Sequence, residues 1–129
     1  MRIAANVLEA IGNTPLVQMH RIVPPGCARV LVKLEGANSM GNMKDRMARA
    51  AIEAAEASGR LQPGDTIVEY TGGSTGASLA LVCAAKGYRL HIVTSDAFSE
   101  EKIGTMRAFG ARITCIRSNN RQITGRWSH

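Results

Sequence analysis

Lys44 is the residue of this chain whose type and position point most directly to chemistry. It lies in residues 38–46, Asn-Ser-Met-Gly-Asn-Met-Lys-Asp-Arg, where a polar loop gives way to an alanine-rich stretch. A lysine amine is a nucleophile only when it is neutral. The positive end of a helix and a nearby cation such as Arg46 disfavour the protonated form. Lys44 is therefore a candidate Schiff-base lysine. The alternative is a solvated lysine whose charge Asp45 balances.

A second polar loop, residues 71–76, has the sequence Thr-Gly-Gly-Ser-Thr-Gly and also precedes a helical pattern. Its glycines allow a ligand to approach the backbone closely. Free amides and hydroxyls at a helix start suit a carboxylate or a phosphate. The alternative is an ordinary turn in which Ser74 caps the helix. No Gly-x-x-x-x-Gly-Lys-Ser/Thr or Gly-x-Gly-x-x-Gly sequence is present, which excludes these two nucleotide-binding motifs.

The elements that position these loops alternate along the chain. Apolar, β-branched runs predict strands at residues 29–34, 66–70, 90–94 and 111–116, and helical spacing predicts helices at 44–58, 75–86 and 99–109. The alternation predicts an α/β fold, with a parallel sheet and helical crossovers. Ligands of such sheets bind at the carboxyl ends of the strands. We therefore expect both loops to project from the same edge.

Composition sets further limits. A chain of 129 residues with 45% hydrophobic residues fits one domain with a real core. It contains no apolar run long enough for a membrane span and no secretory signal. Cys27, Cys83 and Cys115 are widely spaced, so we expect no disulfides and a reducing cytoplasm. Cys83 and Cys115 lie in apolar runs, so we expect both to be buried. The isolated histidines predict no metal site. The net charge of +6 comes from residues 102–129, which we interpret as solvated cations.

Three stretches together resemble a known family. Residues 11–17 are similar to its opening Ile-Gly-Asn-Thr-Pro-Leu-Val segment, and residues 38–46 to its Asn-Pro-x-Gly-Ser-Val-Lys-Asp-Arg lysine motif. Residues 69–76 are similar to its Glu-Pro-Thr-Ser-Gly-Asn-Thr-Gly substrate loop. The order and the spacing also agree. The chain resembles the cysteine synthase and cystathionine β-synthase group of pyridoxal-phosphate enzymes, which have the tryptophan synthase β-like fold.

The resemblance implies that Lys44 forms a Schiff base with pyridoxal phosphate and later acts as the base on the substrate's α-hydrogen. Ser74 takes the position of an asparagine that touches the cofactor in the family. The implied reaction is β-replacement, in which O-acetylserine and sulfide give cysteine. Related members dehydrate serine or threonine, or join serine to homocysteine. The resemblance places the substrate carboxylate on Thr71, Gly72, Gly73, Ser74 and Thr75.

Family members are more than twice as long, and their glycine-rich phosphate loop lies downstream of the region present here. We therefore expect a truncated chain that lacks the C-terminal large domain. Residues 1–28 would be an arm belonging to that absent domain, 29–117 the α/β small domain and 118–129 an irregular tail. Full-length relatives are expected to be cytoplasmic homodimers acting on amino acids, with no nucleic-acid or membrane partner. The alternatives are a non-catalytic remnant that binds a partner and, ranked last, a nucleic-acid-binding module using the basic end.

Overall fold

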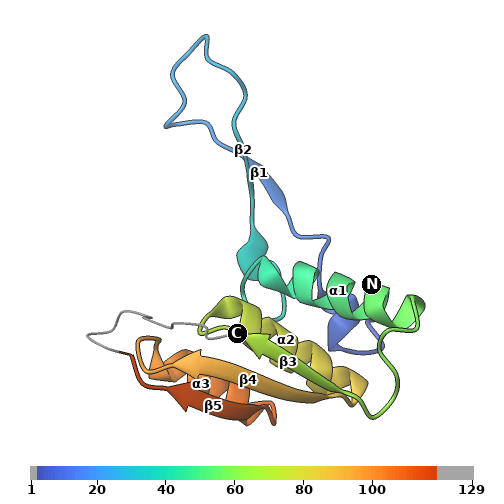
Figure 1. Cartoon of the computed structure of the whole chain (residues 1–129). Coiled ribbons are helices and arrows are strands. Elements are labelled where there is room, and N and C mark those ends of the chain that lie inside the picture. Colours follow the sequence, from blue (N-terminus) through green and yellow to red (C-terminus); the bar gives the residue numbers. More distant parts are fainter. Residues whose placement is uncertain (1–2, 119–129) are drawn as a thin grey trace.

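A three-stranded parallel sheet forms one layer of the molecule, beside the helices that connect its strands (Figure 1). The structure is a computed structural model, and it describes residues 3–118 of the chain. The strand order is β3-β4-β5, with Tyr70 opposite Val93 and Val93 opposite Thr114. The strands are β3 (Thr66–Tyr70), β4 (Arg89–Ser95) and β5 (Arg112–Ile116), and the helices are α1 (Lys44–Ala57), α2 (Ser74–Lys86) and α3 (Glu100–Ala108). The α/β class and the helical crossovers are thus confirmed.

One predicted strand belongs elsewhere. The run at 29–34 contributes β2 (Leu31–Lys33), which pairs antiparallel with β1 (Leu16–Gln18) and not with the parallel sheet. The prediction of a fourth parallel strand was therefore wrong. The hairpin projects away from the rest of the molecule (Figure 1). All six of its strand residues are exposed, so no packing within residues 3–118 holds it against the sheet.

Local sequence explains where the helices begin and end. The Asn42 side chain accepts a hydrogen bond from the Lys44 amide at 2.8 Å, although the capping position of α1 is Met43, which makes no side-chain bond to the helix. Helix α2 ends at Gly87, which adopts φ 79°, a left-handed conformation that costs glycine little. Two short 3₁₀ helices, η1 (Val7–Ala10) and η2 (Glu35–Ala37), flank the hairpin.

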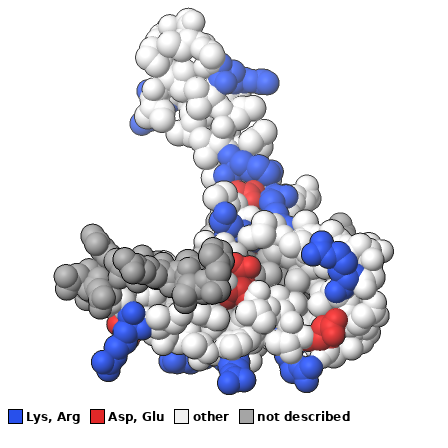
Figure 2. Space-filling model, in the orientation of Figure 1, with Lys and Arg blue, Asp and Glu red and all other residues white. Residues whose placement is uncertain are grey.

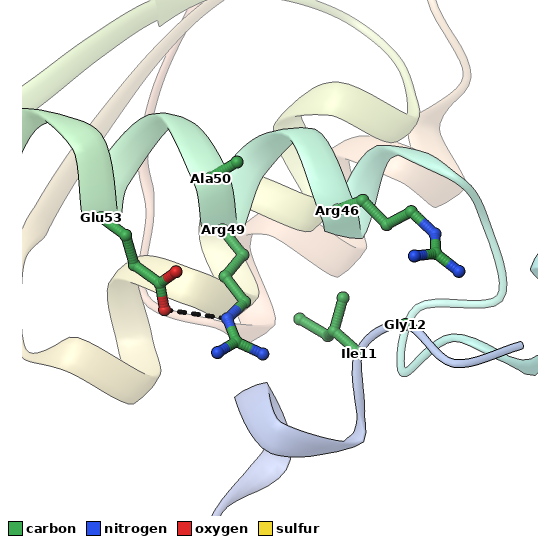
Figure 3. Close-up of a pocket in the computed structure, with 6 residues that line it drawn as sticks. All are labelled: Ile11, Gly12, Arg46, Arg49, Ala50 and Glu53. Carbon is green, nitrogen blue, oxygen red and sulfur yellow. Dashed lines mark hydrogen bonds and ion pairs between the residues drawn. The ribbon is translucent and has the colours of Figure 1, made fainter.

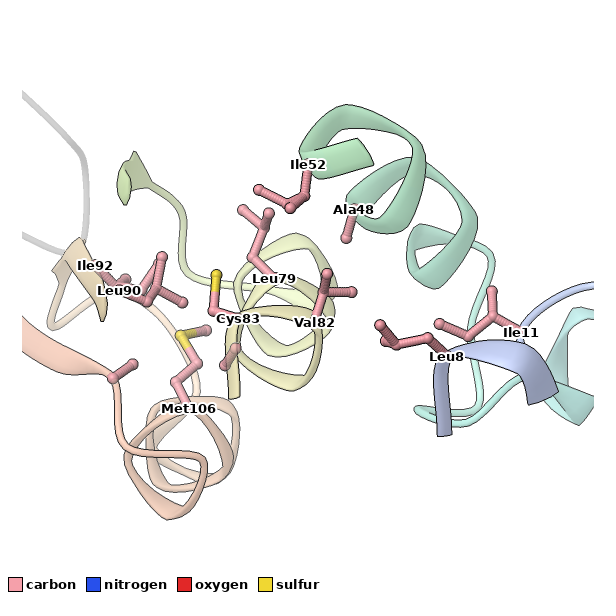
Figure 4. Close-up of a cluster of buried hydrophobic side chains, with 12 residues drawn as sticks. Leu8, Ile11, Ala48, Ile52, Leu79, Val82, Cys83, Leu90, Ile92 and Met106 are labelled. Carbon is pink, nitrogen blue, oxygen red and sulfur yellow. The ribbon is translucent and has the colours of Figure 1, made fainter. Parts of the chain in front are cut away.

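Helix α2 is the centre of the core, in agreement with its apolar residues on every side (Figure 4). Every residue from 76 to 83 is buried. Leu79 and Val82 pack within a cluster that includes Ala48 and Ile52 of α1. The same cluster includes Leu8 and Ile11 near η1, Leu90 and Ile92 of β4, and Met106 of α3. Because α2 lies between α1 and the sheet, its position fixes the start of α1 relative to the strands.

Two further expectations have different outcomes. Cys83 is buried as predicted, but Cys115 is exposed, so that prediction was wrong. Cys115 lies on the edge strand β5, where α3 leaves a cavity open beside it. The irregular tail predicted at 118–129 lies, apart from Ser118, outside the described residues.

Within the described part of the chain, no helix is long and apolar enough to cross a membrane, and no cluster of His, Cys, Asp or Glu could hold a metal ion.

Candidate functional site

Lys44 is the first residue of α1, and its side chain is half-buried. Its amide is held by Asn42, while its ammonium makes no hydrogen bond or ion pair with residues 3–118. Two of the other three lysines give a useful contrast, because Lys33 donates to the Thr14 carbonyl at 3.0 Å and Lys86 pairs with Glu56. The fold therefore holds the backbone of Lys44 in place. It leaves the side-chain nitrogen without a partner among residues 3–118.

A buried carboxylate ties the start of α1 to α2. Asp45 is fully buried and accepts a hydrogen bond from the Ser78 hydroxyl at 2.5 Å and from the Met40 amide at 2.7 Å. Ser78 is also fully buried and lies one turn into α2. Hydrogen bonds to a carboxylate are shorter and stronger than those between neutral groups. The pair therefore fixes the loop before Lys44 beside the first turn of α2, which is where residues 71–76 end.

The loop at residues 71–76 presents donors that lack acceptors. The amides of Gly72, Ser74 and Thr75 make no hydrogen bond within the described chain, and neither do the hydroxyls of Ser74 and Thr75. Ser74 does not cap the helix, as the alternative interpretation required, because the capping position is Gly73 and carries no side-chain bond. Free amides at the positive end of a 13-residue helix favour an anion. The loop is chemically suited to a carboxylate.

Close packing holds this loop from behind. A Cβ atom built on Gly72 would lie 1.8 Å from the Phe98 ring, so the ring rests directly on the glycine backbone. A Cβ on Gly76 would lie 2.7 Å from Met106 and from the Thr71 methyl group. Both glycines are therefore required by neighbouring side chains. Phe98, from the turn after β4, closes one side of the loop and was not identified from the sequence.

An ion pair on the other side of α1 holds the lysine loop to the N-terminal segment. Arg46 donates from Nε to Glu35 Oε2 at 2.7 Å and from Nη2 to Oε1 at 3.1 Å. Thr14 donates its hydroxyl to Glu35 Oε1 at 2.5 Å. The hydrogen bond from Arg46 and then that from Thr14 lower the pKa of Glu35 to about 2, although desolvation acts in the opposite direction. Glu35 is therefore ionised at any physiological pH.

Asn38 completes the support of the lysine loop. It is buried, and its Oδ1 accepts a hydrogen bond from the Gly12 amide at 2.8 Å. Its Nδ2 donates to the Asn42 carbonyl at 2.9 Å and to Glu35 Oε2 at 3.0 Å. Gly12 has φ +94°, a conformation that favours glycine. One amide side chain thus connects the opening segment, the acidic residue and the loop before Lys44.

The pocket in Figure 3 is separate from this site. It has a volume of about 240 Å³ and lies between Ile11 and the face of α1 that carries Arg46, Arg49 and Glu53. At about 100° per residue, Glu53 is on the opposite side of the helix from Lys44. Arg49 pairs with Glu53 at 2.8 Å across this pocket, as the dashed line shows. The pocket therefore offers no route to the lysine.

The residues present fit two of the attachment points that an aldehyde cofactor and its amino-acid substrate require. Lys44 offers an unpaired, half-buried amine. The loop at 71–76 offers unpaired amides and hydroxyls for a carboxylate. The hydrogen bond between Asp45 and Ser78 joins the segment that carries Lys44 to the helix that follows this loop. Sequence reasoning missed this pair, although Ser78 is a polar residue within an otherwise apolar helix and was a visible signal.

Comparisons with known proteins give one consistent result. The model of the family described as "Pyridoxal-phosphate dependent enzyme" matches residues 7–126. The cysteine synthase B of Salmonella typhimurium is 45% identical over 112 residues, which cover 86% of this chain and 37% of that protein. The chain therefore spans little more than a third of the length of this relative.

Solved structures resemble the chain in fold as well as in sequence. The crystal structure of O-ureido-L-serine synthase matches with a TM-score of 0.83 and 41% identity, covering 90% of this chain and 36% of that one. A hydrogen sulfide-producing enzyme from Fusobacterium nucleatum matches with a TM-score of 0.85 and 40% identity, covering 94% of this chain and 40% of that one. The fold prediction is confirmed at this level of similarity.

Proposed function

Because the chain belongs to the family of pyridoxal-phosphate dependent enzymes, we propose that it forms the substrate-holding part of a cysteine synthase-like enzyme. The complete enzyme replaces the β-substituent of an O-activated L-serine, such as O-acetylserine, with sulfide to give cysteine. The observation that carries the proposal is the Ser78–Asp45 hydrogen bond, which sets the loop of Lys44 beside the anion-binding loop. The names of two relatives, cysteine synthase B and O-ureido-L-serine synthase, support a serine-derived substrate or product.

Each part of the chain has a defined task in this proposal. Lys44 would hold the cofactor aldehyde through its amine and would accept the proton from the substrate Cα. When bound, pyridoxal phosphate supplies the electron sink for that proton transfer. Thr71 and Gly73 shape the turn, and the amides of Gly72, Ser74 and Thr75 bind the substrate carboxylate. Fixing the carboxylate orients the Cα–H bond toward the lysine.

Ser74 has a second proposed task. It is the first residue of α2 and is half-buried, with an unpaired hydroxyl. We place it against the cofactor as well as the substrate, because a hydroxyl at this position can donate to either. The serine side chain is shorter than an asparagine side chain, so it reaches less far from the helix. The complete enzyme is proposed to be a cytoplasmic homodimer whose larger domain binds the arm at residues 1–28.

Reductive labelling tests the role of Lys44 directly. The full chain is incubated with pyridoxal phosphate, reduced with borohydride and mapped by peptide mass spectrometry. We expect the label to favour Lys44 over Lys102, an exposed lysine that serves as the internal comparison. The variant Lys44→Ala should lose this label and keep the rest. Labelling that follows exposure alone, with Lys102 as the main product, would contradict the proposed role.

The reaction itself is tested in a chimera. Residues 3–117 replace the matching segment of the Salmonella typhimurium cysteine synthase B, which is 45% identical. We expect cysteine from O-acetylserine and sulfide, and none from the Lys44→Ala chimera. A folded chimera with bound cofactor that forms keto acid from serine, or cystathionine from serine and homocysteine, but no cysteine would refute the proposed reaction. A folded chimera that binds no cofactor would instead favour a non-catalytic remnant.

A further inference from the structure

A cavity lies between helix α3 and the strands that it connects, β4 and β5. In the view of Figure 2, basic side chains are spread over several elements and form no single patch, so surface charge there indicates no large partner. The cavity has a volume of about 340 Å³, and small-molecule sites occupy about 300–1,000 Å³. It is built within one strand-helix-strand unit, and its lining residues are Asp96, Phe98, Glu100, Ile103, Arg107 and Cys115.

Helix α3 presents two opposite charges to this cavity. Glu100, Ile103 and Arg107 are three and seven residues apart, which places them on one face of the helix. Glu100 and Arg107 are separated by about 10.5 Å along the axis, and neither side chain makes a hydrogen bond or ion pair with residues 3–118. Ile103 is buried between them. The cavity therefore offers a carboxylate at one end, a guanidinium at the other and an apolar surface between.

This arrangement of charges suits a zwitterion. A free α-amino acid carries a carboxylate, which a guanidinium such as Arg107 can bind bidentately. Its ammonium group can donate to Glu100. Asp96 adds a second negative charge at the same end, because the hydroxyl and the amide of Ser118 hold the pKa of Asp96 below its usual range. A ligand with charges of only one sign would leave one end of the cavity unpaired.

The strand side of the cavity carries a thiol and, next to it, a hydroxyl that lacks a partner. Cys115 is exposed and lies opposite Thr94 in the register of β4 and β5. Thr94 is fully buried, and its hydroxyl has no hydrogen-bond partner within the described residues, which is rare. Ile92, two residues earlier, packs in the cluster that includes Met106 of α3, so Thr94 and Cys115 face α3 as well. With strands about 4.8 Å apart, this hydroxyl is a donor beside the sulfur.

We propose that this cavity binds the disulfide of a zwitterionic α-amino acid, such as cystine, and that Cys115 forms a mixed disulfide with it. The thiolate of Cys115 attacks one sulfur of the bound disulfide. A bond forms between that sulfur and Sγ, the original disulfide bond breaks, and the departing half leaves as a cysteine thiolate that takes up a proton from water. Cys115 is oxidised and the departing sulfur is reduced, so no other oxidant is needed. The site is additional to the proposed β-replacement and does not use Lys44.

The test compares two cysteines of the same chain. The reduced full chain is treated at pH 8 with cystine, with neutral hydroxyethyl disulfide or with the dication cystamine, quenched with acid and mapped by peptide mass spectrometry. Cys27 is also exposed but does not line the cavity, so it is the internal reference. We expect the ratio of the Cys115 rate to the Cys27 rate to be about threefold higher with cystine than with hydroxyethyl disulfide, as for one partly exposed ionic contact. An equal ratio for these two reagents, or an equal or higher ratio for cystamine, would overturn the proposal.

Neutral variants identify the groups that select the reagent. Arg107→Gln should lower the ratio for cystine about threefold and leave that for hydroxyethyl disulfide unchanged. Glu100→Gln should act in the same way, which provides a second variant if far-UV circular dichroism shows that the first is unfolded. Arg60→Gln removes the same charge in an exposed turn after α1 and should change nothing. Equal losses in Arg107→Gln and Arg60→Gln would overturn the proposal.

The buried hydroxyl has its own signature. Thr94→Val keeps the shape of the side chain and removes the donor, so it should slow the reaction of Cys115 with all three disulfides alike. Thr94→Ser keeps a hydroxyl and should react as the unsubstituted chain does. Unchanged rates in Thr94→Val would overturn the assignment of this hydroxyl to the site.

The chimera described above shows whether the site persists in a complete enzyme. We expect Cys115 to keep its preference for cystine there, because the lining residues 96–115 all lie within the transferred segment. Loss of labelling at Cys115 in the folded chimera would show that the remainder of the enzyme covers the cavity and would overturn the proposal. No cofactor and no turnover enter these measurements, so their failure would leave the proposed β-replacement untouched.

Discussion

Substitution of Ser78 by alanine tests the contact that joins the two halves of the candidate site. The Ser78 hydroxyl donates to Asp45 Oδ1 at 2.5 Å, and neither residue is exposed. A hydrogen bond to a charged group contributes about 1.5–3 kcal/mol. Alanine returns roughly 0.5 kcal/mol because it is the better helix former. We therefore expect Ser78→Ala to lower the free energy of unfolding by about 1–2.5 kcal/mol.

Urea unfolding of the full chain, followed by far-UV circular dichroism, measures this difference. Ser58→Ala is the matched control, since Ser58 is exposed at the end of α1 and donates only to the Ala55 carbonyl. That control should change the free energy of unfolding by less than about 0.5 kcal/mol. If Ser78→Ala is as mild as the control, the contact between α1 and α2 does not hold the site together.

A double-mutant cycle separates the hydrogen bond from other effects of the substitution. Asp45→Asn keeps the shape of the side chain and removes its charge. In contact pairs, the cost of the double variant differs from the sum of the single costs by about 0.5–3 kcal/mol. We expect such a coupling between Asp45→Asn and Ser78→Ala. Additive costs would mean that the two side chains stabilise the fold independently, which would refute the arrangement described here.

Three further predictions follow from individual side chains. Gly72→Ala should destabilise the chain by about 1–3 kcal/mol through its clash with Phe98, and most of the loss should disappear in the Phe98→Ala background, measured by urea unfolding. The depressed pKa of Glu35, about 2 against an ordinary 4.5, means that the folded state favours the carboxylate, so its stabilisation is complete above about pH 4.5. That part of the stability should fade as the pH falls from 4.5 toward 2, and Glu35→Gln should show a flatter profile. Burial raises the pKa of Cys83 to about 11, so at pH 8 a thiol reagent should modify the other two cysteines quickly and Cys83 only after unfolding.

The elements from 66 onward could be predicted because each one has its own local signal. The strand at 66–70 was predicted with its observed bounds, and the helix predicted at 75–86 begins at Ser74. In contrast, the run at 29–34 showed that a strand exists but gave no information on its neighbour. Its partner, Leu16–Gln18, overlaps the end of the opening motif and has only three residues. Strand pairing depends on distant residues, which an apolar run does not identify.

The sequence predicted the candidate residues of the site but not the side chains that hold their loops in place. Lys44 and the loop at 71–76 could be found because glycines and a lysine at helix starts have a clear chemical meaning. The reason that they meet was partly wrong, since β2 is not in the parallel sheet. They are joined instead by Asp45 and Ser78. A buried hydrogen bond between residues 33 positions apart has no periodic signature, so sequence patterns alone could not reveal it.

The opening segment gains a physical role from the same reasoning. Residues 11–17 contribute no group to the candidate site, yet Gly12 donates to Asn38, and Thr14 donates to the Glu35 carboxylate that binds Arg46. These contacts hold the lysine loop from the N-terminal side, while Asp45 holds it from the side of α2. A loop anchored at both ends keeps the backbone of Lys44 in one place before any ligand arrives. Such preorganisation would suit the reacting amine that we propose at Lys44.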